Sequence, residues 1–155
     1  MNQTHENKII HLATDHAGFT LKEQIKAWLE SQGHSVVDHG AQVIDEQDDF
    51  PDFVAPAAQA VADDLANSVA IVLGGSGQGE AMTANRYKGV RAVIYYGGDV
   101  EIVKLSRTHN DANVLALGAR FVDNDNINDV IATWLATPFA GEEKRVRRNQ
   151  KIDQV

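Results

Sequence analysis

Residues 69–80 read VAIVLGGSGQGE, an apolar run that passes directly into a loop of four glycines and ends at Glu80. The run is apolar at every position, which is typical of a strand buried on both faces in a parallel sheet covered by helices. Glycines lack a Cβ atom and can turn their N–H groups toward one point, and a following helix adds unpaired N–H groups and its positive dipole end. The stretch therefore predicts a strand, an anion-binding loop and a helix in that order.

Strand-like runs and amphipathic segments alternate along the rest of the chain. The other strands are expected at 8–13, 34–38, 90–96 and 113–118. This alternation predicts a single domain over 1–155, a Rossmann-like three-layer α/β/α sandwich with a five-stranded, mostly parallel sheet. Ligands of such sheets bind outside the carboxyl ends of the strands, so we expect the site in the loops that follow them.

The helix boundaries are marked by local signals. Thr20 and Glu23 fit a capping box, and Gly33 fits the end of the same helix. An apolar stripe that runs to Leu65 predicts a second helix starting near 49–52, and a third is expected behind Asp99. Asp125 fits the cap of a further helix, which should end before Pro138. Trp28 and Trp134 lie on helix stripes and are expected in the core.

Composition and charge exclude several classes of protein. The chain has 155 residues, no cysteine, a formal net charge of −8 and a pI of about 5.1. The missing cysteines exclude disulfides, cysteine-ligated metals and a thiol nucleophile. The negative field disfavours nucleic acid and anionic membranes as partners. With no signal peptide or membrane span in view, we expect a soluble cytoplasmic protein whose residues 1–7 are flexible.

The glycine loop matches neither common nucleotide motif. No Lys-Ser/Thr pair follows it, and Glu80 stands where a dinucleotide motif has its last glycine, so a nucleotide cofactor is disfavoured. Its anion could be a bound phosphate or an oxyanion that forms during a reaction. A fixed carboxylate repels phosphate but could act as the base that creates an oxyanion. The residues alone leave open whether Glu80 is that base or only caps the helix dipole.

Four segments in order, ATDHAGFTLKEQI, DFPDF, VLGGSGQGEAMTANRYKGVRA and LSRTHNDANVLALGAR, resemble the type B ribose-5-phosphate isomerase family, which also contains galactose-6-phosphate isomerase subunits. The resemblance implies interconversion of ribose 5-phosphate and ribulose 5-phosphate through a cis-enediolate, without cofactor or metal. Isomerisation of galactose 6-phosphate or a tetrose phosphate, and a non-catalytic phosphosugar-binding module, remain as alternatives.

The resemblance also implies roles within the glycine loop. Many family members place a cysteine base where this chain has Gly74, whereas the branch similar to this chain uses the glutamate at the position of Glu80. The Ser76 hydroxyl is expected to hold the enediolate. The main-chain N–H groups expected to assist it belong to Gly75, Gly77 and Gly79.

Ring opening and sugar binding are assigned by the same resemblance. It implies that His109 opens the furanose ring together with Asp15, that Asn110 orients sugar hydroxyls, and that His16 contacts phosphate. An alternative is that His109 only ends a helix at the terminus that favours a cation. Phe50 stands where many relatives have a tyrosine, which removes a hydroxyl from the expected site.

Cations for the phosphate are expected from Arg120 and from the C-terminal segment 141–155. In the family a C-terminal helix crosses to the partner subunit, and two basic residues four positions apart clamp the phosphate. Lys144 and Arg148 fit this spacing, with Arg145 or Arg147 as substitutes if the register shifts by one. The resemblance therefore implies a homodimer or homotetramer with shared active sites.

Overall fold

The computed structural model describes residues 4–155 and contains one five-stranded parallel sheet in the order β2-β1-β3-β5-β4. This confirms the expected strand number and direction. The strands are β1 (Ile9–Thr14), β2 (Val36–Asp38), β3 (Ser68–Gly74), β4 (Ala92–Tyr95) and β5 (Val114–Gly118).

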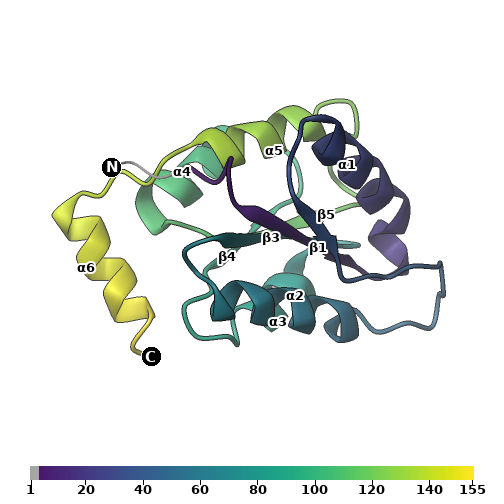
Figure 1. Cartoon of the computed structure of the whole chain (residues 1–155), viewed down its shortest axis with the longest axis horizontal. Coiled ribbons are helices and arrows are strands. Elements are labelled where there is room, and N and C mark those ends of the chain that lie inside the picture. The colour runs from purple at the N-terminus through teal and green to yellow at the C-terminus, as the bar shows by residue number, and fades with distance from the viewer. Residues whose placement is uncertain (1–3) are drawn as a thin grey trace.

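Helices cover both faces of the sheet and make the expected three layers (Figure 1). One face is covered by α1 (Phe19–Ser31), α4 (Glu101–Asn110) and α5 (Ile127–Ala136). The other face is covered by α2 (Pro51–Asp63) and α3 (Gln78–Ala84). A short 3-10 helix, η1 (His16–Gly18), joins β1 to α1. The last helix, α6 (Glu143–Ile152), stands at one end of the molecule, outside the layers.

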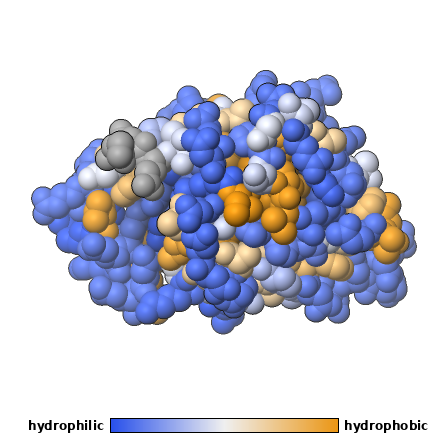
Figure 2. Space-filling view, viewed as in Figure 1, coloured by the Kyte–Doolittle hydropathy of each residue, from blue (hydrophilic) through white to orange (hydrophobic). Residues whose placement is uncertain are grey.

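The central strand β3 explains why the two cores are different. Val69, Ile71 and Leu73 face α1, α4 and α5, whereas Ala70 and Val72 face α2 and α3. Successive side chains of a strand point to opposite faces, so a fully apolar run supplies both cores at once. All seven residues of β3 are buried. In the same view, Figure 2 shows hydrophobic residues reaching the surface mainly between the two helix layers, where the strands lie.

The signals for helix ends are confirmed. Gly33 has a φ of +85°, directly after α1 and its cap residue Gln32. This left-handed conformation ends a helix and suits glycine because it has no Cβ. The helix α5 ends at Ala136, before Pro138.

The expected capping box of α1 is wrong. The helix α1 begins at Phe19 with Gly18 as its cap residue, so Thr20 lies inside the first turn and forms no capping box with Glu23. The reason is that η1 comes first and Asp15 caps it by accepting a hydrogen bond from the Ala17 N–H.

Other boundaries also move. The cap residue of α5 is Asn126 and not Asp125. The helix α2 ends at Asp63, which leaves Leu65 outside it and 44% exposed. The strand expected at 34–38 is shortened to β2, because the chain is still turning away from α1 at His34, whose N–H donates to the Leu29 carbonyl.

His5, near the start of the chain, is buried and hydrogen-bonded to the rest of the fold. Residues 1–3 of the expected flexible segment lie outside the described residues. His5 is 2% exposed, its N–H donates to the Leu135 carbonyl at 2.7 Å, and its Nε2 lies 3.0 Å from the Ala112 carbonyl oxygen. The imidazole also packs against Trp134 with 4.9 Å between ring centroids. Among residues 4–155, none of the helices combines the length and hydrophobicity needed to cross a membrane.

Lowering the pH should destabilise the fold, because burial disfavours protonation of His5 in the folded chain. Burial, followed by the nearby charge of Arg107, lowers the pKa of His5 from 6.5 to about 3. Between those values the unfolded chain binds a proton that the folded chain does not, so the free energy of unfolding decreases as the pH falls from 6.5 toward 3. This imidazole contributes a slope of up to about 1.4 kcal/mol per pH unit. Urea unfolding at several pH values should give a shallower slope for His5→Phe than for the wild type, and equal slopes would contradict this assignment.

Candidate active site

The first turn after β1 places Asp15 at the carboxyl end of the sheet. Its carboxylate caps η1 at 3.0 Å from the Ala17 nitrogen and is 7% exposed. Gly18 closes this turn against β3, where a Cβ at position 18 would lie 2.7 Å from the Leu73 Cβ and would also meet the Thr14 hydroxyl. The missing side chain at Gly18 thus lets the first loop approach the end of β3.

The glycine loop follows β3 and packs on the end of β5. Gly77 has a φ of +79°, and a Cβ there would lie 3.0 Å from the Leu117 carbonyl carbon. Two main-chain hydrogen bonds tie the loop to the segment after β5: the Ala119 N–H donates to the Gly74 carbonyl at 2.8 Å, and the Arg120 N–H donates to the Gly75 carbonyl at 3.1 Å. A glycine at position 77 is therefore required both by the backbone conformation and by the lack of space.

Glu80 is buried in the first turn of α3, only 4% exposed. Its carboxylate lies against Gly74, in the space that a Cβ at position 74 would need. Burial raises the pKa of Glu80, and the negative charge of Asp15 raises it further, while a hydrogen bond from its own backbone N–H acts in the opposite direction. A carboxylate with a raised pKa in a closed site is suited to accept a proton near neutral pH.

Three more side chains lie along the glycine loop. Ser76 is half-buried, and its hydroxyl accepts a hydrogen bond from the Gln78 N–H at 3.3 Å. Arg120 lies over Gly75, where a Cβ would be 3.3 Å from Nη1. The Phe50 ring packs against Gly79. Within one chain the structure therefore brings together most of the sequence-predicted site residues, namely Asp15, His16, Gly75, Ser76, Gly77, Gly79, Glu80 and Arg120.

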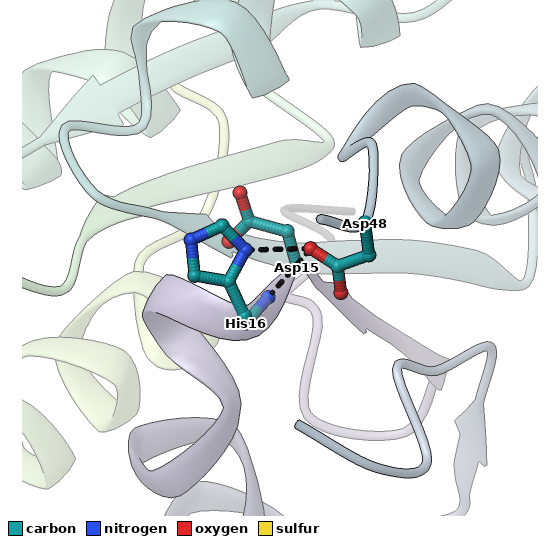
Figure 3. A group of neighbouring side chains, drawn as sticks. All are labelled: Asp15, His16 and Asp48. Atoms are coloured by element: carbon teal, nitrogen blue, oxygen red, sulfur yellow. Dashed lines mark hydrogen bonds and ion pairs between the residues drawn. The ribbon is translucent and has the colours of Figure 1, made fainter. Parts of the chain in front are cut away.

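Sequence reasoning missed Asp48, which binds His16 (Figure 3). Asp48 Oδ1 accepts two hydrogen bonds, one from His16 Nδ1 at 2.6 Å and one from the His16 backbone N–H at 3.1 Å. This pairing raises the pKa of His16, and the charge of Asp15 adds to the effect, whereas desolvation and Arg120 oppose it. No sequence signal separates Asp48 from the other acidic residues of the loop 45–49.

Asp15, His16 and Asp48 offer donor atoms within 4.8 Å of one another, a proximity that suits a metal ion. The contact between His16 and Asp48 does not fit that role. Two tetrahedral ligands that each lie about 2.1 Å from a zinc ion are about 3.4 Å apart. The separation of 2.6 Å between Nδ1 and Oδ1 is instead that of a charge-assisted hydrogen bond.

The remaining predicted residues lie elsewhere in the chain. After β4 the helix α4 returns to the amino ends of the strands, where Asn113 pairs with Arg91 just before β5 begins. His109 and Asn110 end that helix, so they lie at the opposite edge of the sheet from Glu80. The five residues of β5 alone span about 16 Å. Within one chain, His109 is thus separated from Glu80 and from Asp15, its expected partner in ring opening.

The two expected clamp residues are exposed on α6. Lys144 pairs with Glu142 at 3.2 Å, and Arg148 lies one turn further along the helix. The helix is attached near His109, whose carbonyl accepts a hydrogen bond from Asn149 at 3.4 Å, and Asp153 beyond its end pairs with Arg91. The structure therefore gathers Lys144 and Arg148 with the half of the predicted site that lies away from Glu80.

Comparisons by family model, by sequence and by structure all relate this chain to the same group of proteins. Residues 10–153 match the family model described as Ribose/Galactose Isomerase. The chain is 39% identical to ribose-5-phosphate isomerase B of Mycolicibacterium paratuberculosis over 145 residues, which are 93% of this chain and 87% of that protein. The crystal structure of ribose-5-phosphate isomerase B from Mycoplasma genitalium with bound ribulose-5-phosphate is similar, with a TM-score of 0.89, 35% identity and 94% of each chain covered.

A second solved structure agrees with these matches. Ribose-5-phosphate isomerase B from Thermotoga maritima has a TM-score of 0.87 and 36% identity, and the match covers 96% of this chain and 99% of that one. Sequence and backbone thus agree over nearly the whole length, glycine loop included. The chain belongs to the ribose/galactose isomerase family.

Proposed function

We propose that this protein interconverts ribose 5-phosphate and ribulose 5-phosphate. The observation on which the proposal depends is the buried carboxylate of Glu80, which lies beside the glycine loop with a raised pKa. The family membership and the relatives named ribose-5-phosphate isomerase B support the choice of reaction. The cytoplasmic location expected from the sequence stays a prediction.

In the proposed reaction Glu80 removes the proton from C2 of the open-chain aldose. The electron pair moves to the carbonyl oxygen at C1 and gives a cis-enediolate. The hydroxyl proton at O2 then moves to O1, and Glu80 returns its own proton to C1 as the C2 carbonyl of the ketose forms. The Ser76 hydroxyl and the amides of the glycine loop stabilise the negative oxygen, which is what preorganised donors do best in a closed site. Asp15 and His109 open the furanose ring before this step. The phosphate-binding residues proposed are His16, Arg120, Lys144 and Arg148.

We further propose that the complete site forms between two copies of the chain. Glu80 and His109 lie at opposite edges of one sheet, so a second chain has to supply the half that the first cannot reach. A groove of about 570 Å³ along β4 offers a contact surface. Met82 and Ile102 line it and are 66% and 57% exposed, so the groove presents apolar surface that a partner could cover. The second copy of a homodimer would bury them.

The preferred sugar depends on the residues around C3 to C5. Phe50 packs on Gly79 and offers no hydroxyl where many relatives have tyrosine, so one sugar contact is absent. A panel of ribose, galactose and tetrose phosphates would rank the alternatives. Exclusive turnover of a hexose phosphate would reject the pentose as substrate.

Glu80→Gln should slow proton transfer strongly but preserve binding. We expect kcat to fall by about 10²–10⁴-fold with little change in KM, because the general base is lost. Incorporation of deuterium from D2O at C2 of the aldose should slow by the same factor. In the wild type the rate should rise with pH through the pKa of Glu80, above the usual 4.5, because the base acts only when ionised. Glu101→Gln, an exposed glutamate in the first turn of α4, is the matched control.

Gly74→Ala should lower the activity and leave the fold intact. The added Cβ would meet the Glu80 carboxylate, which is the flexible end of a side chain and can move aside. We therefore expect an unchanged fold by circular dichroism and a loss in kcat of about 10²-fold, since a displacement of about 1 Å has that effect on a reacting group. Full activity in this variant would contradict the placement of Glu80 as base.

Mixed dimers should reveal the shared site. Coexpression of a Glu80→Gln chain with a His109→Ala chain should restore about one quarter of the wild-type activity, because half of the dimers are mixed and each of these holds one intact site. Glu80→Gln mixed with Ser76→Ala should restore none, since both residues come from the same half. Recovery in neither mixture would exclude a site divided in this way.

A further inference from the structure

A buried carboxylate lies behind His16 without a place in the reaction described so far. The Asp48 side chain is 9% exposed, although it lies in the otherwise exposed acidic loop between β2 and α2. Its Oδ1 accepts hydrogen bonds from both the Nδ1–H and the backbone N–H of His16. Burial of a carboxylate is costly unless it is paired, so this contact orders the loop as well as the imidazole.

The contact also decides what the other ring nitrogen can do. With Nδ1–H donated to Asp48, Nε2 lies on the far side of the ring (Figure 3). A neutral imidazole in this tautomer presents an acceptor at Nε2, which repels a phosphate oxygen, whereas the imidazolium presents an N–H donor. Binding of phosphate by His16 therefore requires the doubly protonated ring.

The charges around His16 act in both directions. Asp48 and Asp15 stabilise the imidazolium, while Arg120 and partial desolvation oppose it. Asp48 has the largest effect because it alone accepts a hydrogen bond from the ring. Its Oδ2 is also buried and makes no hydrogen bond among the described residues, so the carboxylate is not neutralised by another cation.

We propose that Asp48 is a positioning residue that keeps His16 doubly protonated and directs its Nε2–H toward the phosphate of the substrate. This proposal rests on the proposed function for the identity of the anion. It makes Asp48 part of substrate binding rather than of proton transfer. Its loss should therefore raise KM for ribose 5-phosphate and leave kcat nearly unchanged.

The test measures His16 directly in the full-length protein. An NMR titration of its ring protons should give a midpoint above 6.5 in the wild type and a lower one in Asp48→Asn. Asp49→Asn, the neighbouring exposed aspartate, is the matched control and should leave the midpoint unchanged. A wild-type midpoint at or below 6.5 would overturn the proposal without any variant, even if Asp48→Asn failed to fold.

Binding of inorganic phosphate supplies a second readout that a purely structural role would not give. The ratio of Kd between Asp48→Asn and wild type should be about 1 at a pH below both His16 midpoints measured by NMR, and it should rise to about 10 at a pH above both midpoints. A ratio that does not change with pH would mean that Asp48 only holds the loop. In a His16→Gln background Asp48→Asn should have no further effect on Kd.

Neither measurement depends on turnover. A failure of the proposed isomerisation would appear in the Glu80→Gln experiment, whereas a failure of the Asp48 proposal would appear in the His16 titration. Restoration of the midpoint by Asp48→Glu would support a role for the carboxylate itself.

Discussion

The close packing of main chain at the end of β3 is the constraint on which the rest of the site depends. Gly74 leaves the space that the Glu80 carboxylate occupies, and Gly77 lets the loop lie on the end of β5. A buried strand cannot shift to make room for larger residues, because its two faces are fixed in two cores. The Glu80 carboxylate is therefore positioned by missing side chains as much as by contacts, and burial is the main cause of its raised pKa.

In this acidic protein the charge state of a site depends on its nearest neighbours rather than on the net charge of the chain. A net charge of −8 works against an anionic substrate, so cations have to be concentrated where the phosphate binds. Arg120 lies over Gly75 as a permanent charge, whereas the carboxylate of Asp48 raises the pKa of His16 and favours its cationic form. Elsewhere the same physics acts in reverse: His5 is buried without a carboxylate partner and stays neutral. The pKa values of two histidines in the same chain thus shift in opposite directions because of what surrounds them.

The direction of the helices divides the predicted site into two halves. In a parallel sheet each connecting helix returns to the amino ends of the strands, so residues at its end lie far from residues at its start. Glu80 lies in the first turn of α3, whereas His109 lies in the last turn of α4. A family reaction that uses both residues therefore favours an assembly of two chains, with the exposed apolar groove along β4 as a contact surface.

The sequence by itself determined the five-stranded parallel sheet, the helix ends before Gly33 and Pro138, and the candidate site at the carboxyl ends of β1 and β3. These features depend on local periodicity and on neighbours in the chain. Only the tertiary structure decided that Asp15 caps η1 and displaces the capping box at Thr20, and that Asp48 faces His16. Which of several acidic residues becomes buried depends on how a loop folds onto a distant strand, and no local pattern contains that information.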